Sequence, residues 1–300
     1  MSINNECQGF FVRETLNSRG NYIWVKEPRP DDYPSLEQMD LDRWEINTYS
    51  GILTLTLTTI QPLHIGSGRI VKKENYLVQE FYNHNGIPVI PGSSLKGCIK
   101  HHLTILVGKE NVEKIFGSTS HISLVFFSDA LSQGNIVPQI GEITERWGPR
   151  IKKKDSVKFY QKDSRNTSRK ERMLLVPRNS KFKFTISFRN FTEVYLGALF
   201  IAMGLDPERP RGFKLGGGKG YGLGLVKLKL DSTESWYIKS AKQLLTKDKR
   251  IPVTDNVFTR WINSFWKSLN PRLKKHLICI EENFKNEYGE KSYNTSRSGA

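Results

Sequence analysis

The feature that most constrains this chain is a run of six glycines between Gly216 and Gly224, followed at once by the alternating sequence Leu225-Val-Lys-Leu-Lys-Leu230. Alternation of apolar and charged residues predicts a half-buried strand. Glycine adopts positive φ and lets a second backbone come close, so the run predicts a tight loop leading into that strand. Exposed N–H groups in such a loop bind anions, and Lys214 and Lys219 add positive charge. A P-loop is excluded because its glycines open a helix rather than a strand. An ordinary long hairpin loop is the alternative.

The charge of the chain indicates a polyanionic partner. The formal net charge is +16 and the sequence pI is about 9.7. Residues 146–172 hold eleven basic and three acidic side chains, whereas residues 1–50 hold five basic and nine acidic ones. A surplus concentrated in this way favours nucleic acid bound at the basic segment. A membrane surface is disfavoured because the segment has no amphipathic apolar face.

Nothing in the sequence predicts a membrane span or secretion. No apolar run approaches the roughly 20 residues that cross a bilayer, and no charged-then-apolar leader opens the chain. The three cysteines, Cys7, Cys98 and Cys279, are odd in number and scattered. We therefore expect a reducing, cytoplasmic setting without a disulfide framework.

The order of the predicted elements indicates an α+β fold. Alternation predicts strands at 51–59, 181–188 and 225–230, and helical spacing predicts helices after Ser93-Ser94 and over 191–205; the first helix is expected to end at Gly108. With extended stretches at 76–82 and 122–127, the pattern resembles a ferredoxin-like β-α-β-β-α-β unit.

Four parts follow from this pattern. Residues 1–50 form a Pro-rich N-terminal extension, draped either on a partner or on the chain's own core. Residues 51–230 form the domain, with a long basic insertion at about 142–175. Residues 231–286 turn helical, and residues 287–300 are expected to be a disordered tail.

Two further segments have the chemistry of an RNA-binding surface. Ser93 or Ser94 is placed to be the N-cap of the first helix, whose free N–H groups attract anions, and Lys96 lies one turn further on. An ordinary capped helix is the more frequent reading. The insertion is cationic and is expected to lie outside the core as a hairpin or loop; its rings, Trp147, Phe159 and Tyr160, could stack on bases.

Together, four motifs resemble those of the RAMP superfamily, the repeat-associated RNA-binding proteins of CRISPR systems. They are His64-Ile-Gly-Ser-Gly68, Ile87-Pro-Val-Ile-Pro-Gly-Ser-Ser-Leu-Lys-Gly97, Leu174-Leu-Val-Pro-Arg-Asn-Ser-Lys-Phe-Lys-Phe184 and the glycine loop, residues 215–224. The resemblance covers about residues 51–230 and is closest to the backbone subunits of type III effector complexes. It implies a modified RRM with an inserted hairpin thumb, bound to CRISPR RNA and target RNA beside other RAMP-type and effector subunits. No cofactor is implied for binding.

The resemblance and the charge pattern together give a set of expected RNA-binding residues. They are His64, Lys72, Lys73, Ser93, Ser94, Lys96, Lys100, Arg150, Lys152, Lys153, Lys154, Arg165, Arg169, Lys214, Gly216, Gly217, Gly218, Lys219, Gly220 and Tyr221.

Catalysis is left open at this stage. Target-cleaving members carry an aspartate a few residues after the His-Ile-Gly motif, and here that stretch offers Glu74 and Asn75 instead. The resemblance therefore favours a structural subunit. Glu74 is the candidate for cleavage assisted by Mg²⁺ or Mn²⁺, with Asp129 and Asp155 weaker.

Two further hypotheses remain. One is a metal-independent endoribonuclease that processes precursor CRISPR RNA, disfavoured because no histidine is clearly paired with the glycine loop. The other is a basic RNA-binding module outside CRISPR defence.

Overall fold

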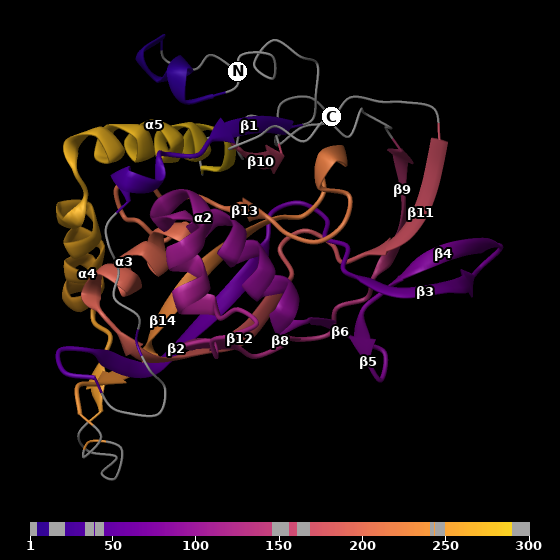
Figure 1. Cartoon of the computed structure of the whole chain (residues 1–300). Coiled ribbons are helices and arrows are strands. Elements are labelled where there is room, and N and C mark those ends of the chain that lie inside the picture. The colour runs from indigo at the N-terminus through magenta and orange to yellow at the C-terminus, as the bar shows by residue number, and fades with distance from the viewer. Residues whose placement is uncertain are drawn as a thin grey trace.

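The computed structural model describes residues 5–11, 22–33, 39, 45–145, 156–160, 169–240, 243 and 250–289. The chain has a mixed α+β fold with helices stacked over one side of a large sheet and a smaller sheet projecting beside it (Figure 1). No helix within these residues is long and apolar enough to cross a membrane.

Three long antiparallel strands form the centre of the large sheet. Strand β2 (Tyr49–Thr59) lies between β12 (Lys181–Phe191) and β14 (Leu225–Ile238), and its Leu55 is opposite Phe184 on one side and Leu230 on the other. The alternating leucines of β2 are fully buried. The sequence predicted all three strands, although β14 is longer than its alternating segment.

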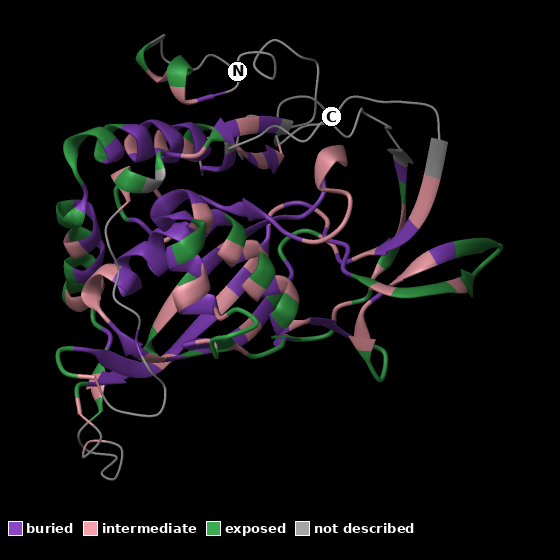
Figure 2. Cartoon of the chain, in the orientation of Figure 1, coloured by how far each residue is buried: buried purple, intermediate pink, exposed green. Residues whose placement is uncertain are grey.

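Shorter strands extend this sheet at both edges, in the order β13-β14-β2-β12-β8-β6-β5, with β7 also paired to β12 and β15 to β14. Their bounds are Asn83–His84 for β5, Ile87–Ile90 for β6, Val125–Phe127 for β7, Ala130–Ser132 for β8, Phe213–Lys214 for β13 and Ile251–Pro252 for β15. Helices α2 (Gly92–Phe116) and α3 (Glu193–Ala202) cover one face, and the core lies between them and the sheet (Figures 1 and 2).

Helix α2 differs from its prediction at its far end. Gly108 has φ of 79° and ψ of 158°, which are not helical, but a second helical segment continues to Phe116. A Cβ at Gly108 would lie 2.8 Å from the ring of Tyr33, so the N-terminal extension packs into the break. The prediction that Gly108 ends the first helical segment is therefore correct, but the sequence analysis missed the second segment, which carries α2 on to Phe116.

The smaller sheet contains the two ends of the insertion. Its order is β3-β4-β11-β9, with bounds Gly66–Lys73, Tyr76–Phe81, Arg169–Leu175 and Gln139–Glu145. Strands β9 and β11 are antiparallel, which confirms a hairpin-like base for the insertion. The β3–β4 hairpin extends away from the body and is largely exposed (Figure 2).

The sequence predicted that the whole insertion lies outside the core, but strand β10 within it does not. Strand β10 (Ser156–Tyr160) pairs with β1 (Tyr22–Lys26), and Val157 and Phe159 are buried in the core. The prediction is wrong for β10 because its alternate residues are apolar. Phe159 therefore cannot stack on bases; Trp147 lies outside the described residues.

The described parts of the N-terminal extension lie on the chain's own core. They include the short 3₁₀ helices η1 (Asn5–Phe10) and η2 (Pro30–Asp32), and Phe11 is fully buried. Cys7 forms a disulfide with Cys279. The prediction that the chain has no disulfide is wrong, because the fold brings together two cysteines that cysteine spacing alone could not pair.

Two C-terminal helices complete the fold, so the helical prediction for residues 231–286 is correct from Asp255 onward, whereas residues 231–238 belong to β14 and residues 251–252 to β15. Thr254 caps α4 (Asp255–Ser268), and Asn270 caps α5 (Pro271–Tyr288), each by accepting a backbone N–H in the first turn. Such caps satisfy donors that have no partner inside the helix.

Candidate nucleic-acid interface

The glycine loop is held by the turn that follows the first long strand. Gly217 N donates to His64 O at 2.8 Å, and Gly224 N donates to Pro62 O at 2.8 Å. At Gly216, where φ is +79°, a Cβ would lie 2.2 Å from His64 O. The backbone that approaches this glycine is therefore the chain's own, and two of the sequence motifs form one unit.

His64 lies beneath this unit rather than on a surface. Its side chain is 2% exposed, and Nδ1 donates to Leu174 O at 2.9 Å. Burial lowers the pKa of the ring, so it is neutral near pH 7. His64 thus joins the first motif to the third, and it can affect a ligand only through the loop that it supports.

The start of α2 adjoins the glycine loop, but its cap differs from the expected one. Pro91 is the N-cap, and Ser93 and Ser94 lie in the first turn. The carboxylate of Asp129 accepts the Gly92 N–H at 2.8 Å. The serine N-cap prediction is wrong because a carboxylate from a distant turn takes that place.

A basic pocket of about 510 Å³ opens between α2, β10 and the glycine loop. The polar lining of this basic pocket includes Ser93, Ser94, Lys158, Tyr160, Lys214 and Lys219. Among the described residues that line it there is no Asp or Glu. The structure thus brings together the predicted binding residues Ser93, Ser94, Lys214, Gly216 and Lys219.

The three lysines of the basic pocket have different surroundings. Lys214 is buried and donates to Gln61 Oε1 and to Leu223 O, so it fixes the glycine loop from inside. Lys219 lies in the short helix η3 (Lys219–Tyr221), with Nζ 5.4 Å from the centre of the Tyr160 ring. Lys158 Nζ is 4.9 Å from the same centre. Sequence reasoning missed Lys158 because nothing local shows that β10 returns to the core.

Two neighbouring histidines hold β10 against α2. His101 Nε2 donates to Lys158 O at 2.7 Å. His102 is buried, with Phe159 5.0 Å away between ring centres and Arg211 Nη1 3.5 Å from Nδ1. Burial, and then the charge of Arg211, keep the pKa of His102 well below its usual value. A neutral ring in this position supports the wall of the pocket without adding charge.

Comparison with known proteins agrees with this geometry. The family model of the RAMP superfamily matches residues 56–227, which include β2, the start of α2 and the glycine loop. The chain belongs to the RAMP superfamily.

Other comparisons add little beyond that. A solved structure described as Type III-B Cmr-beta bound to cognate target RNA aligns with a TM-score of 0.44 and 21% identity. The alignment covers 65% of this chain and 62% of that chain, so it spans less than two thirds of the protein it matches. No curated protein matches the sequence.

The C-terminal helices lie outside the RAMP match and are joined to the start of the glycine loop. Arg211, fully buried, donates through Nε to Glu281 Oε2 at 2.7 Å and through Nη2 to Glu281 Oε1 at 3.0 Å. Gly212 N donates to Tyr288 O at 3.0 Å. These contacts tie α5 directly to the segment that enters the loop.

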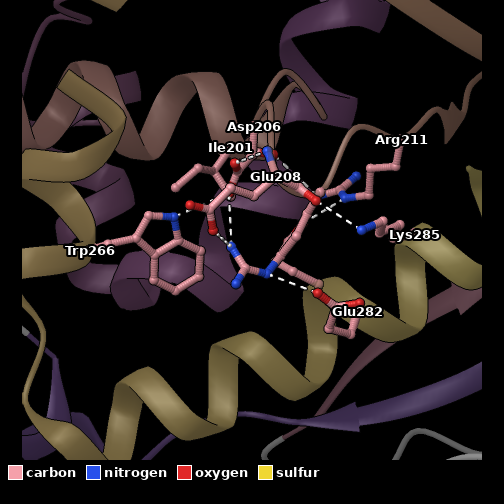
Figure 3. A network of polar contacts seen from close by, with 9 residues as sticks. Ile201, Asp206, Glu208, Arg211, Trp266, Glu282 and Lys285 are labelled. Carbon is pink, nitrogen blue, oxygen red and sulfur yellow. Dashed lines mark hydrogen bonds and ion pairs between the residues drawn. The ribbon is translucent and has the colours of Figure 1, made fainter. Parts of the chain in front are cut away.

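A second network beside Arg211 ties both C-terminal helices to the end of α3 (Figure 3). Asp206 accepts from Trp266 Nε1 at 3.1 Å and pairs with Arg209, which also reaches Glu282 at 3.2 Å. Lys285 donates to Glu208 O at 2.8 Å. The glycine loop is thus anchored by residues that none of the four RAMP-like motifs includes.

Other predicted residues of the RAMP region lie away from the basic pocket. Lys96 points toward Ser123, to which Nζ donates at 2.8 Å, and burial lowers its pKa, with Lys100 adding to the effect. Lys72, Lys73 and Glu74 are exposed on the β3–β4 hairpin. Glu74 forms its turn with φ of 53°.

Glu74 lines a different concavity, of about 740 Å³, together with Lys73 and Glu80. It shares no lining residue with the basic pocket. Within the described part of the chain, no group of three or more His, Cys, Asp or Glu side chains could hold a metal ion.

The remaining predicted residues are only partly placed. Gly218 and Gly220 belong to the glycine loop, and Tyr221 packs against a small apolar cluster formed by Ile143, Met173 and Leu223. Arg169 begins β11. Arg150, Lys152, Lys153, Lys154, Arg165 and Asp155 lie outside the described residues.

Proposed function

We propose that this RAMP protein is a CRISPR RNA-binding structural subunit of a type III interference ribonucleoprotein. The observation that carries the proposal is that two motifs far apart in sequence, the start of α2 and the glycine loop, line one basic pocket without acidic lining among the described residues, while the His64 motif holds the glycine loop in place. A pocket that offers lysines, hydroxyls and a tyrosine ring matches the backbone and bases of a single RNA strand.

The fold supports the same proposal. The elements β2, α2, β8, β12, α3 and β14 follow a strand-helix-strand-strand-helix-strand order, which favours the ferredoxin-like core of a modified RRM. We take the β9–β11 pair as the base of a thumb that separates guide RNA from target RNA. The partners would be CRISPR RNA, target RNA and further RAMP-type subunits.

The experiment is to purify the native protein and to sequence the RNA that accompanies it. We expect repeat-derived RNA of uniform length. Affinity for a labelled single strand should fall steeply with added salt, because phosphate contacts release counterions. A heterogeneous mixture of cellular RNA would instead indicate an RNA-binding module outside CRISPR defence.

Cleavage of target RNA is a separate question that depends on Glu74. RNA binding as proposed needs no metal ion, whereas cleavage through one carboxylate would need Mg²⁺ or Mn²⁺. Assembled complexes that contain the wild type or Glu74→Ala, assayed with either ion, show whether this carboxylate contributes. Cleavage of repeat RNA in EDTA tests the precursor-processing alternative.

A further inference from the structure

We propose that the basic pocket takes one unstacked nucleotide of the bound RNA, with its base on the ring of Tyr160 and its phosphate on the neighbouring lysines. This inference rests on the proposed function and deepens it, because it names the unit that the site receives. It assigns a binding role to β10, a strand that the four sequence motifs do not include.

The contacts of Tyr160 suggest how a base would be accepted. The ammonium groups of Lys158 and Lys219 lie 4.9 Å and 5.4 Å from the centre of its ring, which is partly exposed in the pocket. A cation–π contact at an exposed site is weaker than a base stacked on an aromatic ring. A base can therefore replace a lysine on the ring, and the released ammonium is then positioned to pair with the phosphate of the same nucleotide.

The charge of the pocket favours an anion over a neutral ligand. Three lysines line it, and no carboxylate does so among the described residues. Lys214 is already bound to the loop, and Lys158 and Lys219 both lie beside the Tyr160 ring, where they can meet the ligand. The volume of about 510 Å³ is in the range of sites that enclose one small ligand, and a duplex could not enter it.

Gly97 provides an independent sign that space is kept open here. It lies in α2 and lines the pocket, and a Cβ built on it would meet no atom within 4 Å. Glycine inside a helix is destabilising relative to alanine, and neither packing nor positive φ requires it at this position. No other described part of the chain fills the space beside Gly97, which is therefore available to a ligand.

The test uses the full chain and single-stranded RNAs in which one base at a time is 2-aminopurine, whose fluorescence is quenched by stacking. In the wild type, we expect one position to change its fluorescence on binding more than its neighbours. Tyr160→Ala should abolish that change and weaken RNA binding by about 5- to 150-fold, the range for loss of one base–aromatic stack. Tyr160→Phe should retain both within about twofold, because it keeps the ring.

Matched variants separate stacking from general effects. Tyr76→Ala removes another exposed ring with a cation above it, since Arg172 lies 4.1 Å from its centre, but on the β3–β4 hairpin. It should bind RNA like the wild type. Gly97→Leu fills the pocket but leaves the Tyr160 ring in place. This variant should lose both the 2-aminopurine fluorescence change and the affinity for RNA, while its thermal unfolding stays cooperative.

The outcomes are distinguishable. If the wild type binds RNA in a salt-dependent manner, but Tyr160→Ala and Gly97→Leu bind equally well, the inference is wrong and the proposed function stands. If the wild type binds no RNA, both are wrong. If a free nucleoside monophosphate quenches tyrosine fluorescence in the pocket while RNA affinity is insensitive to Tyr160, the occupant is a free nucleotide and the inference is overturned.

Discussion

The two sides of the basic pocket are built in different ways. The floor, made of the glycine loop and the start of α2, is fixed by backbone hydrogen bonds to the His64 turn and by the buried Arg211–Glu281 pair. The wall, made of β10, is held by β1 and by α5, both outside the RAMP match. The comparison teaches that the family motifs supply main-chain rigidity, while the insertion, held in place by the two extensions, supplies the ring and one of the lysines that would select a nucleotide.

The largest effect is expected at the floor, from Arg211→Ala. This variant leaves Glu281 buried without its partner, which should lower the free energy of unfolding by about 3–5 kcal/mol. The matched control is Arg260→Ala, which breaks an ion pair between Glu193 and an arginine whose side chain is 48% exposed. This variant should lower the free energy of unfolding by no more than about 1 kcal/mol. Urea unfolding measures both. Equal losses would show that the buried pair does not anchor the loop.

Acidification should weaken the contacts that hold the wall. His276 of α5 stacks on Phe10, 4.3 Å between ring centres, and burial lowers its pKa to about 4, below the ordinary 6.5. Among nearby charges Asp32 raises this pKa, whereas Arg272 and Lys26 lower it. Because the folded state binds the proton less well, stability is retained above pH 6.5 and is lost as the pH falls toward 4.

The shift of the His276 pKa from 6.5 to about 4 corresponds to no more than about 3.4 kcal/mol, at 1.36 kcal/mol per pKa unit. The measurement is the pH dependence of unfolding for the wild type and for His276→Gln. Other buried histidines titrate in the same direction, so the difference between the two proteins isolates His276. A variant with the same slope as the wild type between pH 4 and 6.5 would contradict the assignment.

Two glycines with the same backbone conformation should respond differently to substitution. Gly216 and Gly68 have φ of +79° and +84°, but a Cβ at Gly68 meets nothing within 4 Å, whereas one at Gly216 meets His64 O at 2.2 Å. We expect Gly68→Ala to cost about 1 kcal/mol from backbone strain, and Gly216→Ala about 2–3 kcal/mol because the loop must also shift. Thermal unfolding of the pair gives the comparison.

The smallest effect has the opposite sign. Gly97→Ala should raise stability by about 0.5–1 kcal/mol, because alanine favours the helix and the added methyl group meets no atom. Calorimetry on the wild type and this variant is sufficient. A loss of stability would show that the floor is strained at this position in a way that its contacts do not reveal.

Local pattern was enough to predict much of the fold and the floor. Alternation identified β2, β12 and β14, since the side chains of a half-buried strand repeat every two residues. The motifs likewise predicted Ser93, Ser94, Gly216 and Lys219 as RNA-binding residues, and the structure brings these four together in one pocket.

The wall could not be predicted in this way. The register of β1 and β10, in which Val25 faces Val157, joins segments far apart in the chain, and neither has a sequence signal that names its partner. The sequence offered Asp129 only as a weak candidate for cleavage, whereas in the fold its carboxylate accepts the Gly92 N–H at the start of α2. The odd number of cysteines argued against pairing, yet the pair arises from the packing of η1 on α5. Each of these errors concerns a long-range contact.

The disulfide between Cys7 and Cys279 spans 272 residues, and this fixes an order of events during synthesis. A chain leaves the ribosome from its N-terminus, so Cys7 is made early and has no partner until α5 emerges. The glycine loop is complete by residue 224, well before that moment. Its anchor is not, because Glu281 lies two residues beyond Cys279, so the floor is fixed at the same late step that joins the two ends of the protein.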